Sequence, residues 1–470
     1  MTIHSRCSSR HLVRLIIPLL LCFAVILQPV TLTAFQGLGE RGLTKRGLDK
    51  NDRAFLEELS YRCFLFFWEQ ADPHTGLIPD RALVVGLPAP GRARNIANVA
   101  ATGFGLTAIC LGAKHRWITP EQARRRILLT LNFLATQAPE VHGFYYHWMD
   151  KTNGQRIMHS EISSIDTALL LAGVLTTREA FPHDREIVRL STFIYERADF
   201  TWMLNGSPVL LSHGWVPGAG FITHRWDSYC ELMILYLLAL GSPTHSIPAS
   251  SWYAWRRPLV HFQGYTFVGD LPLFTQQYTQ AWIELRGLRD APPSNIDFFQ
   301  NSAAATLANR AFCLHFAKAF PKSYSDKIWG VTASDSSRGY IVWGEPSDFS
   351  VIDGTVVPCA PGGSLIFTPA VCLQALKAMR DKFGSKVYSR YGFTDAFNPT
   401  EGWYDQDVIG IDTGITLLSA ENLLDGGVWR LFMHNNNIQR AMLLAKLRPE
   451  GVFSGVFKRY YQFYEQHTLF

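Results

Sequence analysis

Carboxylates set among aromatic residues are the groups in this sequence whose types and spacing could do chemistry. They gather in four stretches, 145–173, 212–240, 272–287 and 402–422. A sugar ring presents apolar CH faces and hydroxyl groups, so a sugar site combines flat aromatic side chains with carboxylates and amides. Cleavage of a glycoside needs one protonated carboxyl to assist the leaving oxygen and one carboxylate to act as base or nucleophile. The pattern therefore favours a carbohydrate site.

The first stretch places Glu161 at the expected start of a helix and Asp166 in its second turn. Five positions turn a helix by about 140°, so the two carboxylates cannot share one face. A favourable charge at a helix N-terminus would explain Glu161 without any function. The preceding loop, however, would place His147, Trp148 and Asp150 beside Glu161. We therefore expect these loop residues to contact substrate.

The second stretch contains Glu231 at the edge of an apolar, nearly uncharged run. Burial of a lone carboxyl in such a run raises its pKa, and a raised pKa is what a general acid working near neutrality requires. The alternative is a buried Glu231 paired with Arg225. We expect the nearby aromatic residues Trp215, Trp226 and Tyr229 to contact substrate.

The third and fourth stretches add further candidates for sugar binding. Gln277, Tyr278 and Trp282 would lie on one side of a helix, where core packing explains the two aromatic residues equally well. Trp403 and Asp412 lie in the fourth stretch. Asp412 could instead be a helix N-cap, which is a common structural use of aspartate.

No motif in the sequence indicates a cofactor or a metal. The chain has no GxSxG, GxxxxGK[ST] or HExxH motif, and its six cysteines outside the leader form no CxxC or Cys/His cluster. We expect at most one disulfide and no structural zinc. Gly103 and Gly105 are better explained by close packing between helices than by a dinucleotide site.

Helix signals recur at short intervals along the chain, whereas strand signals are short and confined to 208–215 and 340–344. The expected helices cover 52–70, 101–115, 120–137, 161–180, 184–200, 227–241, 248–256, 301–320, 367–383, 413–424 and 436–447. About a dozen helices with long loops at alternate connections suggest helix pairs closed into a double ring. A solenoid of helix pairs fits the helix count too, but no fixed internal repeat is visible.

The N-terminal residues resemble a secretory signal. Residues 1–34 combine three arginines, an apolar stretch over 15–27 and a small residue at the end. The apolar stretch is short for a membrane span, although an uncleaved anchor remains an alternative. We expect a signal peptide over 1–34, a flexible tether over 35–48, a single domain over 49–470, and a periplasmic or secreted location.

The composition supports a large folded core. The 470 residues are 47% hydrophobic, 13% aromatic and 18% charged, which excludes a disordered chain. The net charge is +5, and the leader contributes three arginines to it, so the remainder is nearly neutral. We expect a poly- or oligosaccharide substrate, no nucleic acid partner, and no stable membrane partner beyond the export signal.

Nine segments, taken in order along the chain, resemble the glycoamylase-like bacterial family that includes endo-β-1,2-glucanases. They are ATGFGLTAICLG (101–112), SEISSIDTALLLAG (160–173), HGW (213–215), YCELMILYLLALGSPTH (229–245), IDFFQNSAAATLANR (296–310), WGVTASD (329–335), DGTVVPCAPGGSLIFTP (353–369), YGFTDAFNP (391–399) and IGIDTG (409–414). The resemblance implies an all-α (α/α)6 toroid and a metal-independent, inverting glycoside hydrolase of β-linked glucan, with β-1,2-glucan favoured. It also implies Glu231 as the general acid, and Glu161 or Asp166 as the base or as sugar contacts.

Four positions depart from the family pattern as we expect it. Gln276 and Gln280 stand where the family often has His, Ala303 where Arg is frequent, and Ala370 where Glu is usual. These departures leave open a glycan-binding protein without catalysis. The fold would also suit a polysaccharide lyase, but a lyase needs a basic cleft for uronates and the near-neutral charge argues against one.

Overall fold

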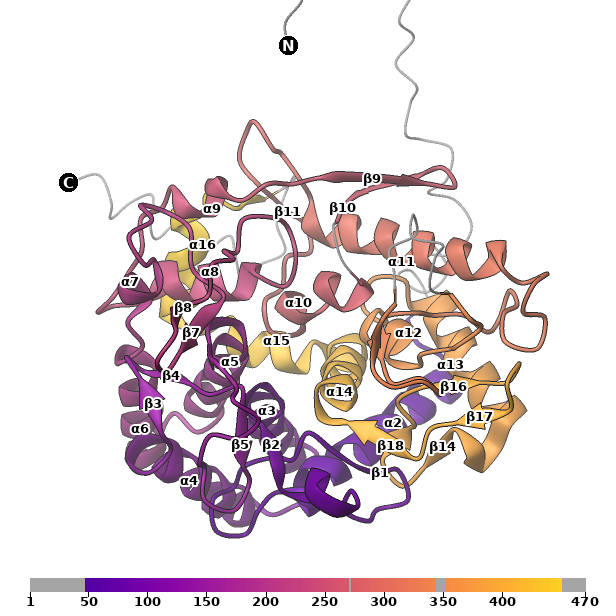
Figure 1. Cartoon of the computed structure of the whole chain (residues 1–470), viewed down its shortest axis with the longest axis horizontal. Helices are drawn as coiled ribbons and strands as arrows, with labels where there is room; N and C mark the ends of the chain where they lie inside the picture. The colour runs from indigo at the N-terminus through magenta and orange to yellow at the C-terminus, as the bar shows by residue number, and fades with distance from the viewer. Residues whose placement is uncertain (1–46, 270–271, 344–351, 450–470) are drawn as a thin grey trace, which may run out of the picture. The chain divides into compact units, whose positions relative to one another are not determined.

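Helices of two kinds alternate along the chain (Figure 1). In the computed structural model, which describes residues 47–269, 272–343 and 352–449, one kind is buried along nearly its whole length. These inner helices are α3 (Val99–Lys114), α5 (Ser164–Ala180), α8 (Met233–Gly241), α10 (Tyr278–Trp282), α12 (Cys359–Gly363) and α14 (Gly410–Asp425). The others bury one side: α2 (Lys50–Gln70), α4 (Pro120–Thr136), α6 (Arg185–Glu196), α11 (Phe298–His315), α13 (Pro369–Phe383) and α16 (Asn436–Leu444).

The inner helices form a closed ring. Helix α3 contacts α5, α5 contacts α8, and α8 contacts α10, while α14 contacts α10, α12 and again α3. The outer helices pack behind them, with α2 against α3 and α14, and α6 against α5. This arrangement is the (α/α)6 toroid, and the all-α prediction is confirmed.

One outer position departs from strict alternation. Between α8 and α10 the chain contains only the one-turn helix α9 (Ser251–Ala254), and α16 from near the C-terminus packs against α8. The toroid therefore fills its fourth outer position partly with a distant segment.

Glycines allow the inner helices to approach each other closely. A Cβ atom on Gly103 would lie 2.2 Å from the Leu169 carbonyl oxygen, and one on Gly173 would lie 2.1 Å from the Gly103 carbonyl oxygen. Only hydrogen fits at both positions. The interpretation of Gly103 as a residue of close helix packing is confirmed.

The two ends of the ring differ. Short helix α15 (Gly427–Phe432), which follows α14, contacts α3, α5, α10 and α14 and closes the end where these helices finish. At the opposite end, short strands lead directly into inner helices. β2 (Ile96–Asn98), β6 (Ile162–Ser163) and β18 (Asp407–Ile409) precede α3, α5 and α14. The N-termini of these inner helices therefore open toward the loops.

Most strands of the described residues form two-stranded antiparallel sheets, with β6-β7-β8 the three-stranded exception. The remaining elements are β1 (Arg81–Leu83), β3 (Glu140–Val141), β4 (Phe144–Tyr145), β5 (Trp148–Asp150), β7 (Gly214–Val216), β8 (Gly220–Phe221), β9 (Leu259–Phe262), β10 (Tyr265–Val268), β11 (Leu288–Arg289), β12 (Ala333–Ser334), β13 (Ile341–Val342), β14 (Tyr388–Ser389), β15 (Gly392–Phe393), β16 (Phe397–Asn398), β17 (Trp403–Tyr404), β19 (Arg448–Pro449), α7 (Phe200–Met203), η1 (Gly91–Asn95), η2 (Leu273–Gln276) and η3 (Gly384–Lys386).

Two inner helices that carry candidate site residues begin at other positions than predicted. Helix α5 begins at Ser164 after the N-cap Ser163, so Glu161 precedes the helix and Asp166 lies in its first turn rather than its second. Helix α14 begins at Gly410, so Asp412 lies in its first turn and is not the N-cap. Helices α10 and α12 are too short to show a periodic pattern, and α12 was not predicted.

The expected signal peptide lies outside the described residues, as does most of the expected tether. Among the described residues, no helix combines the length and apolar character needed to cross a membrane. Cys63, Cys110, Cys230, Cys313, Cys359 and Cys372 are all buried, and none of these described cysteines forms a disulfide.

Candidate active site

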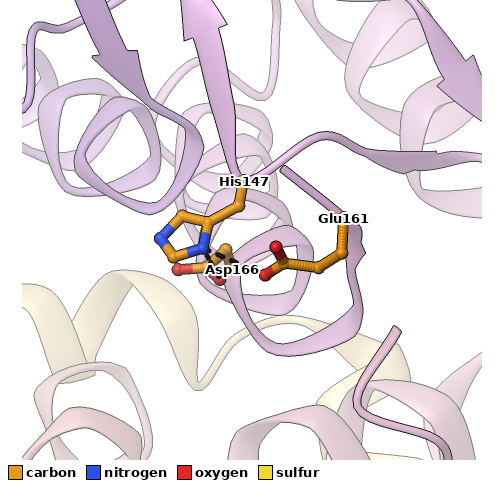
Figure 2. A group of neighbouring side chains, drawn as sticks. All are labelled: His147, Glu161 and Asp166. Atoms are coloured by element: carbon orange, nitrogen blue, oxygen red, sulfur yellow. Dashed lines mark hydrogen bonds and ion pairs between the residues drawn. The ribbon is translucent and has the colours of Figure 1, made fainter. Parts of the chain in front are cut away.

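His147 joins the two carboxylates of the first stretch at the N-terminus of α5 (Figure 2). Its Nδ1 atom lies 3.0 Å from Glu161 Oε1 and 3.7 Å from Asp166 Oδ2. Burial disfavours the protonated imidazole, but the charges of Asp166 and Glu161 outweigh this effect and raise the pKa of His147 to about 9. The pKa of Glu161 is lowered because the bond to His147 outweighs burial. Both groups are therefore charged near neutral pH.

The backbone around this cluster fixes its side chains. The Ser163 hydroxyl caps α5 by accepting from the Asp166 N–H at 3.2 Å, and it donates to Asp166 Oδ2 at 2.5 Å. A Cβ atom on Gly214 of β7 would lie 3.2 Å from Glu161 Cγ, so glycine lets that strand pass close to the carboxylate. The neighbouring Trp215 pairs with Ile162 in the same sheet.

The other loop residues of the first stretch lie nearby but differ in their contacts. The Trp148 ring stacks on His147 with centroids 4.2 Å apart. Asp150 accepts from the Thr152 N–H at 2.8 Å and the Thr152 hydroxyl at 2.5 Å, which is the pattern of a turn. Trp148 thus packs against the His147 cluster. The contacts of Asp150 instead stabilise the turn of its own loop.

Glu231 lies just before α8, at the same end of the ring. Its Oε2 atom is buried and has no hydrogen-bond partner among the described residues. Burial raises the pKa of Glu231 to about 7, and the charge of Asp166 adds to the shift. Arg225, the partner considered from the sequence, donates instead to the carbonyl oxygens of Leu204, Leu210 and Asn205. Glu231 is therefore a buried carboxyl that can hold its proton near neutral pH.

Several predicted sugar contacts are buried and bonded to the protein. Trp226 Nε1 donates to Ser164 Oγ at 2.8 Å, and Tyr229 donates its hydroxyl hydrogen to Gln276 Oε1 at 2.6 Å. Trp282 Nε1 donates to Thr107 Oγ1 at 3.0 Å within the ring. These contacts support a role in packing the inner helices against each other and against the segments that precede them.

Of the remaining candidates of the third and fourth stretches, Gln277 and Tyr278 lie at the N-terminus of α10. Gln277 Nε2 donates to the Ala360 carbonyl and to Ser364 Oγ, both at 2.8 Å, and so ties α10 to α12. Tyr278 is buried, and the negative charges of Asp412 and Glu231 add to the burial that raises its pKa. Trp403 is half-buried in β17.

A second group of charged residues surrounds Arg81 and was not predicted as a site. The Arg81 guanidinium lies 3.3 Å from Asp80, 2.7 Å from Asp335 and 3.2 Å from Asp407. Asp405 Oδ2 is buried without a hydrogen-bond partner among the described residues. Burial and the charges of Asp335 and Asp407 raise the pKa of Asp405 to about 7.

Asp412 joins this group to the ring. Cys359 Sγ donates to Asp412 Oδ1 at 3.2 Å, and the Asp412 side chain hydrogen-bonds that of Asp395. Burial raises the pKa of both aspartates, and that of Asp395 is raised further by the charges of Asp412 and Asp405. The only sequence signal for Asp335 and Asp395 was their position in the segments WGVTASD and YGFTDAFNP.

Two side-chain groups among the described residues have atoms spaced like metal ligands. They are His147 with Glu161 and Asp166, and Asp335 with Asp405 and Asp407, each with all ligand atoms within 4.8 Å. A protein cation already lies among the carboxylates in both groups, because His147 is protonated in the first and Arg81 contacts the second. Both groups are therefore ion-pair networks of the protein itself. The absence of a metal cofactor stays a prediction.

Comparisons with known proteins agree with the fold. Residues 223–436 match the glycoamylase family model, described as "Putative glucoamylase". A Parabacteroides distasonis protein described as an exo beta-1,2-glucooligosaccharide sophorohydrolase (non-reducing end) is 26% identical over 83% of this chain. This chain spans 57% of the length of that relative.

Two solved structures are similar to this chain over most of its length. The endo-beta-1,2-glucanase from Chitinophaga pinensis, in complex with sophorotriose and glucose, is 28% identical with a TM-score of 0.77, covering 84% of this chain and 98% of that one. A beta-1,2-glucanase from Parabacteroides distasonis is 25% identical with a TM-score of 0.76, covering 84% of this chain and 60% of that one.

Proposed function

Because this chain belongs to the glycoamylase-like family, we propose that it is a glycoside hydrolase acting on β-1,2-linked glucan. The similar proteins that are described as β-1,2-glucanases or as a sophorohydrolase support this substrate. The ring end that holds Glu231, Glu161 and Asp166 supplies the two kinds of carboxyl group that glycoside cleavage needs.

Glu231 is the general acid in this proposal. The observation that carries it is the buried Glu231 Oε2 atom, which has no hydrogen-bond partner among the described residues. Burial outweighs the hydrogen bonds from the backbone and from the Cys230 side chain and raises the pKa of Glu231 to about 7, so the carboxyl can hold a proton near neutral pH. In the reaction, Glu231 transfers this proton to the glycosidic oxygen as the bond between that oxygen and the anomeric carbon breaks.

Asp166 is the leading candidate for the base, ahead of Glu161. Its charge acts on Glu231, whereas Glu161 is bonded to His147. Asp166 would accept a proton from a water molecule as the water oxygen attacks the anomeric carbon from the face opposite the leaving group, which inverts that centre. Protonated His147 would hold both side chains in place through its contacts with them.

Two of the four departures from the family pattern, Gln276 and Gln280, are buried and hydrogen-bonded in the protein interior. Gln276 accepts from Tyr229, Asn301 and Ser302, and Gln280 donates to Ser302, all in the buried interior. No observation therefore favours the glycan-binding protein without catalysis over the hydrolase.

A digestion experiment tests the proposal. The purified chain should release short oligosaccharides from β-1,2-glucan and not from β-1,3- or β-1,4-glucan. Glu231→Gln should lower kcat by about 10²–10⁴-fold, the usual contribution of a general acid. Glu57→Gln, on the exposed side of α2, is the matched control and should be fully active. Full activity of Glu231→Gln, or cleavage of another linkage alone, would contradict the proposal.

We also propose export to the periplasm or beyond through the N-terminal 34 residues. The supporting observation is the sequence pattern of basic, apolar and small residues in that order. A fusion of residues 1–40 to a reporter active only outside the cytoplasm should give signal, and replacing Leu19, Leu20 and Leu21 with Asp should abolish it. Equal signal from both fusions would contradict export.

A further inference from the structure

Asp395 and Asp412 are two buried carboxyl groups from distant segments that meet at the wall of the site. Asp395 follows β15, and Asp412 lies in the first turn of α14. Their residues are only 3% and 5% exposed. Both line a cavity of about 20 Å³, which has room for a single water molecule.

One oxygen atom of each carboxyl group in this pair accepts a hydrogen bond from an N–H or S–H group. Asp395 Oδ2 accepts from the Asp335 N–H at 2.8 Å, and Asp412 Oδ1 accepts from Cys359 Sγ at 3.2 Å. Asp395 Oδ1 and Asp412 Oδ2 are buried and have no donor among the described residues, although the two side chains are within hydrogen-bond reach. Two bare carboxylates in such contact would repel each other strongly, so a proton must lie between them.

We propose that Asp395 is a neutral carboxylic acid that donates its hydrogen to the Asp412 carboxylate and so positions Asp412, ionised, at the site. The inference deepens the proposed function, since it gives Asp412 a defined charge where the substrate would bind. Asp395 is a positioning residue that acts through Asp412.

The surroundings place the proton on Asp395 rather than on Asp412. Asp412 lies in the first turn of α14, where the free N–H groups of the helix favour a negative charge, and it receives the Cys359 thiol hydrogen as well. Asp395 has one backbone donor. Six titratable groups face the pair from the packed elements: Asp80, Tyr278, Asp335, Tyr340, Cys359 and Asp405. The carboxylates among them disfavour a second negative charge on Asp395.

Infrared difference spectroscopy on the free protein tests this assignment without any substrate. At pH 7.5 the spectrum of the native chain minus that of Asp395→Asn should contain the C=O stretch of one protonated carboxylic acid. The matched control Asp184→Asn, at the N-cap of α6, should lose only an ionised carboxylate band, because its hydrogen bonds to backbone N–H groups and its pairing with Arg124 lower the pKa of Asp184. A difference spectrum for Asp395→Asn with no carboxylic acid band would overturn the proposal, whatever the substrate proves to be.

Kinetics then test the positioning role. Asn at position 395 still donates to Asp412 and still accepts from the Asp335 N–H, so Asp395→Asn should keep kcat within about threefold. Asp395→Leu removes the donor and should move the acidic limb of kcat/KM upward by about one to two pH units. Equal losses in the two variants, both folded by circular dichroism, would show that the charge of Asp395 matters and would refute the role. If Asp395→Leu does not fold, the kcat of Asp395→Asn and the infrared difference band still test the proposal.

Discussion

Arg81 Nη1 donates a hydrogen bond to Asp335 Oδ2 at 2.7 Å, although 254 positions separate the two residues in the chain. Arg81 begins β1, which pairs with β18 and so brings Asp407 to the same guanidinium. One cation thus holds three segments together at the end of the ring where the inner helices begin. The stability of this end depends on that single guanidinium.

Replacing Arg81 by Gln should destabilise the fold. The change leaves the carboxylates of Asp80, Asp335 and Asp407 without their partner, and breaking a buried ion pair in this way costs about 3 kcal/mol. Urea unfolding at pH 7 measures the loss. Arg189→Gln removes an exposed pair with Glu186 and should cost under about 0.5 kcal/mol. Equal losses in the two variants would contradict the central role of Arg81.

His147 should make the stability of the chain depend on pH. Its pKa is raised from 6.5 to about 9 in the folded protein, so its ion pairs contribute fully below about pH 6.5 and are lost as the pH rises through 9. The difference in unfolding free energy between the native chain and His147→Gln should therefore shrink from pH 6.5 to pH 9.5. Exposed His183→Gln should show no such trend. A constant difference would mean that His147 is not protonated.

Glu231 should lower the free energy of unfolding as the pH rises through neutrality. Its pKa lies near 7 in the fold and 4.5 when exposed, so folding becomes less favourable as the pH rises from 4.5 to 7. At pH 8, Glu231→Gln should unfold at a higher urea concentration than the native chain. Its free energy of unfolding should be larger by on the order of 2 kcal/mol. The two should coincide at pH 4. A variant that is less stable at pH 8 would show that the Glu231 charge is paired.

The same carboxyl should set the alkaline limb of activity. On β-1,2-glucan, kcat/KM should fall above about pH 7 as Glu231 loses its proton. Asp166→Asn removes a nearby negative charge that raises this pKa, so the residual activity of the variant should have its alkaline limb at lower pH. An alkaline limb at the same pH in Asp166→Asn would show that the charge of Asp166 does not influence the pKa of Glu231.

Helix contact at Gly103 should tolerate no side chain. Gly103→Ala places a Cβ atom against the rigid Leu169 carbonyl and should cost about 3 kcal/mol. In the neighbouring Gly105→Ala, the new atom meets the Ile78 side chain, which can move, so the loss should be smaller. Chemical denaturation of both variants measures the difference, and the reverse order would refute the packing argument.

The sequence by itself determined the fold class and the existence of an acidic, aromatic site. Apolar runs such as residues 232–240 indicated buried helices. The helix count fitted a double ring or a solenoid, and the family resemblance of nine ordered segments implied the (α/α)6 toroid. The lone Glu231 beside such a run and the His147, Glu161 and Asp166 cluster were found in this way because the residues of each are close in the chain.

Tertiary structure alone decided which carboxylates share protons and cations. Arg81, Asp335, Asp395 and Asp412 lie far apart in the chain, so no local period or spacing joins them, and only closure of the ring brings α14 back to α3. The same closure buried Tyr229, Gln277 and Trp282, whose residue types alone are equally suited to a cleft. Protonation is a property of burial and of neighbouring charge, and both arise only when distant segments pack.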